Sequence, residues 1–296
     1  MDSPSKGAPR EVARVITAHR QREGAGFIVR RPLPTQGLEL LDPFLLIDEL
    51  GPIDYRPGEA IGAPDHPHRG FETVTYVLEG EGEHEDSAGH RGVIGPGAVQ
   101  WMTAGRGVVH SEMPSRRLQR EGGRMHGFQI WVNLPARDKM MAPRYQEVAA
   151  DKLPEGRSAD GLARVRVVAG EALGARAVIG TRTPIQYLDF TLLPGAVVEQ
   201  PLTAGWSAGV YVFAGRALVG QRELQDGQLG VLWQGESVRL AVPAEAKEPA
   251  RLLVLAGQPL NEPVARYGPF VMNTTEEIHQ AFRDYQDGRM GKIDRA

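Results

Sequence analysis

Short runs of β-forming residues, separated by glycine and proline turns, dominate this sequence. The chain contains 36 glycines and 22 prolines, and no single linker gathers them. Between them lie runs rich in valine, leucine, isoleucine and aromatic residues, at 72–78, 99–102, 127–132, 210–213 and 251–255. Such runs favour pleated strands, and glycine and proline favour the turns between them. The sequence therefore predicts an all-β sandwich or barrel.

One amphipathic α-helix is expected near the C-terminus. Thr274 stands three residues before Glu277, which is the spacing of a capping box. Apolar residues then recur at helical intervals, at Ile278, Ala281, Phe282 and Tyr285. Gly288 supplies a stop signal.

A weak internal duplication predicts two related barrels. The segment Tyr76-Val77-Leu78-Glu79-Gly80 is echoed by Tyr211-Val212-Phe213-Ala214-Gly215. The 296 residues, of which 41% are hydrophobic, suffice for two domains with buried cores. We expect a first barrel over 11–136, a connection over 137–160, a second barrel over 161–262 and a tail with the helix over 263–296.

Composition disfavours several classes of protein. The formal net charge is −3 and no basic stripe is present, so a nucleic-acid partner is not expected. The absence of cysteine excludes disulfides, zinc–thiolate centres, iron–sulfur clusters and a cysteine nucleophile. No stretch approaches the ~20 apolar residues of a membrane span, and no apolar secretory signal opens the chain. We therefore expect a cytoplasmic protein without a membrane partner.

Two tripeptides contain the candidate metal ligands of the chain: His66-Pro67-His68 and His110-Ser111-Glu112. Residues two apart on a strand project from the same face, so each pair can direct both side chains into one interior. Three imidazoles and one carboxylate suit a divalent first-row metal ion and, at six-coordination, leave positions open for water, substrate or dioxygen. A single His-x-His arises by accident in a chain with 8 histidines, whereas two such pairs favour a metal site.

The remaining histidines are interpreted differently. His84 and His90 stand among acidic residues and predict a solvated hairpin tip, and His126 precedes an apolar strand as a core residue or a residue that supports a ligand. His19 and His279 stand alone among charged residues. The second copy has no histidine in its strands, so we expect it to pack without a transition metal.

With these features, the chain resembles the cupin superfamily, whose first motif is Gly-x5-His-x-His-x3-4-Glu-x6-Gly. His66, His68 and Gly80 match it, but counting back from Gly80 places Thr73 at the position of the family glutamate. Glu112 is placed to supply the missing carboxylate, on the same strand face as His110.

More narrowly, the chain is similar to pirins. The matching text is Leu41-Asp42-Pro43-Phe44, His66-Pro67-His68-Arg69-Gly70-Phe71-Glu72-Thr73, Gln129-Ile130-Trp131-Val132-Asn133-Leu134-Pro135 and Gly268-Pro269-Phe270-Val271-Met272-Asn273-Thr274. The resemblance implies two tandem cupin barrels, each a double-stranded β-helix or jelly roll, with a short C-terminal helix. It also implies one Fe2+ per chain, held by His66, His68, His110 and Glu112 in the first barrel, and a second barrel without metal.

The resemblance to bacterial pirins implies quercetin 2,3-dioxygenase activity, in which dioxygen opens a flavonol and carbon monoxide is released. Glu112 would then accept the flavonol 3-hydroxyl proton as general base. Candidate residues around the ligand are Arg69, Glu72, Met125 and Gln129.

Two other classes remain open at this point. One is a non-catalytic protein whose metal acts as a redox switch for a protein partner, as a transcriptional co-regulator or an enzyme modulator. The other is a metal-dependent isomerase or a sugar-binding cupin, because a fold does not fix its chemistry.

Overall fold

The computed structural model describes residues 8–295, which form two compact units. Unit 1 contains the residues through His19, Pro32–Pro43 and Leu153–Pro259. Unit 2 contains Arg20–Arg31, Phe44–Lys152 and the residues from Leu260 onward. Each unit is therefore assembled from separated segments of the chain.

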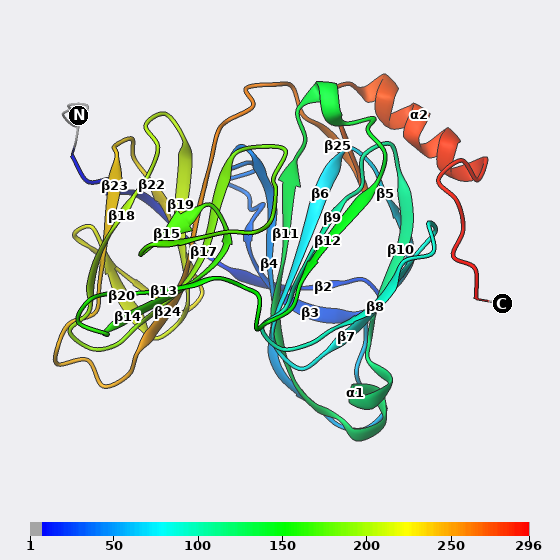
Figure 1. Cartoon of the computed structure of the whole chain (residues 1–296). Helices are drawn as coiled ribbons and strands as arrows, with labels where there is room; N and C mark the ends of the chain where they lie inside the picture. Colours follow the sequence, from blue (N-terminus) through cyan, green and yellow to red (C-terminus); the bar gives the residue numbers. More distant parts are fainter. Residues whose placement is uncertain (1–7, 296) are drawn as a thin grey trace. The chain divides into compact units, whose positions relative to one another are not determined.

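Unit 2 is a barrel built from a seven-stranded and a four-stranded sheet (Figure 1). In order across the larger sheet, the strands are β12 (Arg144–Val148), β9 (Val99–Thr103), β6 (Phe71–Glu79), β11 (Gly123–Asn133), β4 (Phe44–Tyr55), β3 (Phe27–Leu33) and β2 (His19–Glu23). Across the smaller sheet they are β5 (Ala63–His68), β10 (Val108–Pro114), β7 (Gly82–Asp86) and β8 (Arg91–Ile94). This is the jelly-roll architecture expected from the sequence.

Unit 1 has the same arrangement of one seven-stranded and one four-stranded sheet. The larger sheet contains β1 (Val12–Thr17), β22 (Gln228–Leu232), β19 (Ser207–Ala214), β24 (Ala250–Gly257), β17 (Ile185–Leu192), β14 (Ala163–Ala169) and β13 (Glu155–Arg157). The smaller sheet contains β18 (Val197–Pro201), β23 (Ser237–Ala241), β20 (Arg216–Val219) and β21 (Arg222–Gln225). A two-stranded ribbon joins β15 (Glu171–Ala172) to β16 (Ala175–Arg176).

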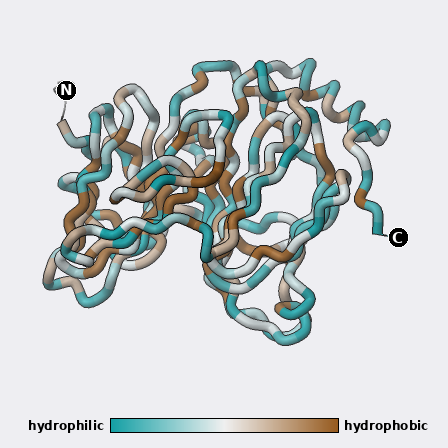
Figure 2. The backbone as a smooth tube through the Cα atoms, in the orientation of Figure 1, coloured by the Kyte–Doolittle hydropathy of each residue, from teal (hydrophilic) through white to brown (hydrophobic). Residues whose placement is uncertain are grey.

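Apolar side chains from both sheets fill the interior of unit 1. Val165, Phe190 and Leu252 of the larger sheet belong to the same buried cluster as Val219 and Leu240 of the smaller sheet. Hydrophobic residues follow the strands in the tube representation as well (Figure 2). Close packing of this kind stabilises a barrel through burial of apolar surface.

The strand and helix predictions agree with the structure. The five apolar runs lie in β6, β9, β11, β19 and β24. The C-terminal helix α2 spans Thr275–Gln286, and Thr274 and Glu277 form the expected reciprocal capping box. A second helix, α1 (Arg116–Glu121), was not expected, because six residues show no helical periodicity. The segment between the two expected barrels contains a 3-10 turn at Ala136–Asp138 and the strands β12 and β13.

The C-terminal segment packs onto unit 2. It contributes the hairpin of β25 (Ala265–Tyr267) and β26 (Phe270–Met272), followed by α2. Its apolar residues form a buried cluster with Val109 of β10: Phe270, Met272, Ile278, Ala281 and Met290. None of the described helices is both long and apolar enough to traverse a lipid bilayer.

A buried lysine ties this segment to the barrel. Lys139 is 1% exposed, and its Nζ donates hydrogen bonds to Asn133 Oδ1 at 2.6 Å, Gly70 O at 2.7 Å and Val271 O at 3.1 Å. Burial lowers the pKa of Lys139 to about 8, although the charges of Glu262 and Glu277 oppose the shift. The ammonium is thus held by oxygen atoms at a cost in desolvation.

The lowered pKa of Lys139 predicts a pH-dependent stability. The unfolded chain, with the ordinary lysine pKa of 10.5, binds more protons than the folded chain above pH 8, so stability from this residue rises with pH. We expect the free energy of unfolding of the wild type to gain about 2 kcal/mol over that of Lys139→Met between pH 7 and pH 10. Urea unfolding of both proteins measures this difference, and a constant difference would contradict the prediction.

Candidate metal centre

Three histidines converge where β5 and β10 pair. His110 lies directly opposite His66 in the antiparallel register, and Val108 lies opposite His68. One ligand atom from each imidazole lies within 4.8 Å of the others. The Nε2 atoms of His66 and His68 are 3.1 Å apart. Two donors about 2.1 Å from one ion and at right angles to each other are separated by about 3.0 Å, so this spacing fits adjacent ligands.

Backbone carbonyls set the tautomers of two of these imidazoles. His66 Nδ1 lies 2.8 Å from Pro64 O, and His68 Nδ1 lies 3.3 Å from Pro269 O. A carbonyl oxygen only accepts, so both Nδ1 atoms carry the proton and both Nε2 atoms present lone pairs. Facing lone pairs repel unless a cation lies between them. Both ring nitrogens of His110 are buried without a hydrogen-bond partner, so all three imidazoles are suited to a metal ion.

Burial keeps two of the imidazoles neutral. It lowers the pKa of His68 well below the usual range, and the neighbouring His66 contributes to the shift. The pKa of His110 is lowered in the same way by burial and then by His68 and His66. Neutral imidazole is the form that coordinates metals, so no proton has to be displaced at physiological pH.

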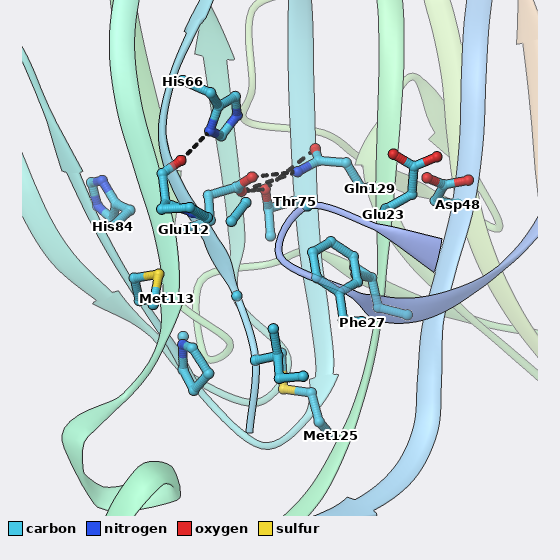
Figure 3. A pocket seen from close by; sticks show the side chains of 18 of the residues that line it. Glu23, Phe27, Asp48, His66, Thr75, His84, Glu112, Met113, Met125 and Gln129 are labelled. Carbon is cyan, nitrogen blue, oxygen red and sulfur yellow. Dashed lines mark hydrogen bonds between the residues drawn. The ribbon is translucent and has the colours of Figure 1, made fainter. Parts of the chain in front are cut away.

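The carboxylate of Glu112 lies in the same cavity but is held by other side chains. Gln129 Nε2 donates to Glu112 Oε1 and Oε2 at 3.0 and 2.9 Å, and Thr75 Oγ1 donates to Oε1 at 2.7 Å (Figure 3). A register shift follows His110, so Glu112 pairs with Ala63 of β5. Glu112 is therefore not part of the three-histidine group.

His66 and His68 open into a cavity between the two sheets of unit 2. Its volume is about 610 Å³, within the range of small-molecule sites. Strand alternation directs Gln129 and Trp131 of β11 into it, along with Leu46 and Asp48 of β4. Most of the remaining wall is apolar: Phe27, Ile28, Leu50, Ile53, Ile61, Val77, Ile94, Met113, Leu118 and Met125.

Of the four residues expected around a ligand, Met125 and Gln129 line this cavity. Arg69 and Glu72 do not: Arg69 pairs with Asp284, and Glu72 accepts a hydrogen bond from Thr103 Oγ1 at 2.5 Å. On β6, Thr73 has the same facing as the cavity residues Thr75 and Val77. Glu72 faces the opposite side.

The other histidines lie in different environments, some buried and some exposed. The prediction that His84 lies at a solvated hairpin tip is wrong, because His84 is 2% exposed and lines the cavity, with Nε2 2.7 Å from Glu147 Oε1. Strand β7 pairs with β10 in the smaller sheet and places His84 opposite Glu112, and the sequence alone does not reveal this pairing. His90 is exposed, and its Nδ1 lies 2.9 Å from Asp86 Oδ2. The expectation of a core position for His126 is confirmed by its burial and its 2.8 Å contact with Glu49.

The C-terminal segment supplies a positioning contact that sequence reasoning missed. Pro269, which orients the His68 ring, lies between β25 and β26, 201 residues along the chain. Val271 N donates to Arg69 O at 3.1 Å, next to His68. Arg69 Nη1 in turn donates to Asp284 Oδ2 of α2 at 2.7 Å. The tail therefore fixes the strand end that bears a candidate ligand.

Asp284→Asn is expected to loosen this anchor. Burial raises the pKa of Asp284, but hydrogen bonds from Arg69, Gln280 and Arg289 outweigh it and lower the pKa to about 2. The ionised form therefore contributes stability above about pH 4, which is lost as the pH falls toward 2. At pH 7 we expect the free energy of unfolding to fall by about 2 kcal/mol, because a charge-assisted hydrogen bond is lost.

Chemical denaturation measures the effect of Asp284→Asn, and Asp287→Asn is the matched control. Asp287 pairs with Arg289 at 2.7 Å, but its side chain is 57% exposed, so its removal should change stability by less than about 1 kcal/mol. Equal effects of the two substitutions would contradict an anchoring role for Asp284.

Comparison with known proteins agrees with this architecture. The family model described as Pirin matches residues 26–132, and that described as Pirin C-terminal cupin domain matches 187–291. A pirin-like protein of Solanum lycopersicum is 46% identical over 286 residues, covering 96% of this chain and 94% of the relative. Pirin of Homo sapiens is 44% identical, covering 96% of this chain and 95% of the relative.

Among solved structures, quercetin 2,3-dioxygenase from Acinetobacter baumannii superposes with a TM-score of 0.90 at 37% identity, covering 97% of this chain and all of that one. The two family models match both halves of this chain, which forms two cupin barrels. The two relatives named above are each more than 40% identical to this chain over 96% of its length. The chain belongs to the pirin family.

Proposed function

We propose that unit 2 binds one Fe2+ ion through His66, His68, His110 and Glu112 and catalyses the opening of a flavonol by dioxygen. The observation that carries this proposal is the convergence of three imidazoles, two of them buried, beside a mostly apolar cavity of about 610 Å³ that His66 and His68 line. The similarity to quercetin 2,3-dioxygenase from Acinetobacter baumannii supports the substrate class. The donor set suits first-row divalent metals, and the resemblance to pirins favours iron among them.

When bound, the iron would supply Lewis acidity toward the flavonol 3-hydroxyl and redox access to dioxygen. The protein supplies the remaining elements of the reaction. The apolar wall, including Phe27, Met125 and Trp131, packs against a flat aromatic ligand and excludes water from the reacting atoms. Because the flavonol, dioxygen and the metal ion would be held in one cavity, they would not have to meet by diffusion in solution.

Glu112 is the residue placed to take the 3-hydroxyl proton. Its carboxylate lines the same cavity as His66 and His68, and Gln129 and Thr75 fix its orientation with three hydrogen bonds. Coordinated histidines have no free lone pair for this task, whereas a carboxylate has a second oxygen. Glu112 would therefore serve both as an oxygen donor and as the general base.

The test combines metal analysis with turnover on one sample. Protein loaded anaerobically with Fe2+ is expected to contain one metal ion per chain and, on addition of quercetin and air, to bleach the flavonol while releasing one carbon monoxide per flavonol. Protein loaded with one metal ion per chain that leaves quercetin unchanged would refute the dioxygenase. That result would favour a metal-dependent interaction protein. Protein that binds no metal would refute the site itself.

A further inference from the structure

A cluster of charged side chains lies in the cavity wall away from Glu112. Arg31 of β3 donates through Nε to Asp48 Oδ1 of β4 at 2.6 Å, and its Nη2 lies 2.8 Å from Glu23 Oε1 of β2. All three side chains line the cavity. In Figure 3, Glu23 and Asp48 lie beyond Gln129 on the side away from Glu112.

A polar row across the sheet connects this cluster with Glu112. Thr75 of β6 pairs in register with Gln129 of β11, which pairs in register with Asp48 of β4. Neighbouring strands lie about 4.8 Å apart, so the backbone positions of Thr75 and Asp48 are about 10 Å apart. The row begins at Glu112, which Thr75 and Gln129 hold, and ends at Asp48. It crosses a wall that is otherwise mostly apolar.

Fold stability is a weak explanation for the cluster. Taking an ion pair out of water costs free energy, and a buried pair is often no more stabilising than apolar side chains of the same volume. The side chains of Asp48 and Arg31 are 6% and 12% exposed. Burial raises the pKa of Asp48 to about 6 even though Arg31 opposes the shift. The carboxylate is therefore poorly solvated in the protein alone.

The cluster retains hydrogen-bonding capacity for a ligand. A carboxylate offers about four acceptor positions, and Arg31 uses two of those on Asp48. Glu23 is a second carboxylate at the same place, with 35% of its side chain exposed. Hydroxyl groups are the donors that such acceptors recognise on an aromatic ring. The apolar side chains elsewhere on the wall would leave those hydroxyls unpaired.

We propose that Asp48 and Glu23, positioned by Arg31, form a recognition subsite for hydroxyl groups on the ring of the ligand that lies away from the metal centre. The cavity then selects polyhydroxylated flavonols over flavonols that carry only the 3-hydroxyl. This inference rests on the proposed flavonol chemistry and names the part of the substrate that is recognised. Asp48 and Glu23 are specificity-determining residues and take no part in the reaction itself.

The experiment compares two flavonols that share the reacting group. Quercetin and 3-hydroxyflavone both present the 3-hydroxyl, but 3-hydroxyflavone lacks every other hydroxyl. Binding to iron-loaded protein is measured without oxygen by quenching of tryptophan fluorescence. Quercetin is expected to bind about tenfold to a hundredfold more tightly than 3-hydroxyflavone, which is the range for hydrogen bonds to a charged group.

Asp48→Asn is expected to remove most of this preference. Quercetin affinity should fall toward that of 3-hydroxyflavone, while 3-hydroxyflavone affinity stays within about twofold and reports an intact cavity. Glu23→Gln should reduce the preference less, because Glu23 is more exposed than Asp48. Asp54→Asn is the matched control on β4, since Asp54 lies outside the cavity with its side chain 74% exposed.

The outcomes separate the subsite from the dioxygenase. Equal wild-type affinities for the two flavonols, or a preference that survives Asp48→Asn, would overturn the subsite even if both compounds are bleached. A preference for quercetin that Asp48→Asn abolishes, without bleaching in air, would support the subsite and refute the dioxygenase. Failure of iron-loaded protein to bind either flavonol would overturn both.

Discussion

His110→Ala is expected to abolish stoichiometric metal binding and leave a folded barrel. Changes in residues that merely hydrogen-bond to metal ligands lower metal affinity by about 10-fold to 100-fold, so loss of a ligand should cost at least about 100-fold. Both ring nitrogens of His110 are buried without a hydrogen-bond partner, so the substitution removes no other polar contact. Metal per chain after anaerobic loading and dialysis measures the effect, and far-UV circular dichroism checks the fold.

His84→Ala is the matched control for His110→Ala. The two histidines are buried to nearly the same extent, with 2% and 1% exposure, and both lie on the smaller sheet of unit 2. His84 lies outside the three-histidine group, so its replacement should leave one metal ion per chain. Full metal retention by His110→Ala, or equal loss in both variants, would show that the ligands are not these histidines.

Glu112→Gln is expected to lower kcat for flavonol bleaching by about 10²-fold to 10⁴-fold, the range for loss of a general base. The amide has nearly the shape of the carboxylate, and its single oxygen, placed at the Oε1 position, can still accept from Thr75 and Gln129, but the amide cannot take a proton. Stopped-flow absorbance at saturating quercetin gives kcat, with iron determined on the same sample so that loss of metal is not mistaken for loss of the base.

Glu83→Gln is the matched control for Glu112→Gln, because it makes the same chemical change at another residue of the same cavity. Glu83 lines the wall, and its Oε1 accepts a hydrogen bond from Arg116 N at 2.7 Å, which the amide oxygen can also accept. We expect its kcat to stay within about threefold of the wild type. A kcat for iron-loaded Glu112→Gln within tenfold of the wild type would exclude Glu112 as the base.

The position of Glu112 illustrates the limit of the strand argument. Spacing places His110 and Glu112 on one face of β10, and both side chains do reach the interior of unit 2. The spacing does not reveal the register shift between β10 and β5, nor the hydrogen bonds from Gln129 and Thr75 that hold the carboxylate. Both features depend on neighbouring strands. Joint binding of one ion by all four residues therefore stays a prediction.

Most of the contacts that the sequence does not predict join residues that lie far apart in it. His68 and Pro269 are separated by 201 positions, and Lys139 and Val271 by 132. Nothing local to His68 or Lys139 signals either partner, because each contact exists only after the C-terminal segment has packed against the barrel. The same holds for Arg31 and Asp48, which resemble ordinary surface charges in the sequence.

The sequence by itself determined the β-rich architecture, the C-terminal helix with its Thr274–Glu277 capping box and the pair of tripeptides that carry the candidate ligands. These features are local: turn chemistry, side-chain alternation and capping act over a few residues. Only the tertiary structure decided that His84 is buried, that Pro269 orients His68 and that a charged cluster faces the cavity. The physical reason is that burial and long-range hydrogen bonds depend on which sheets and segments come together, and no local pattern records that choice.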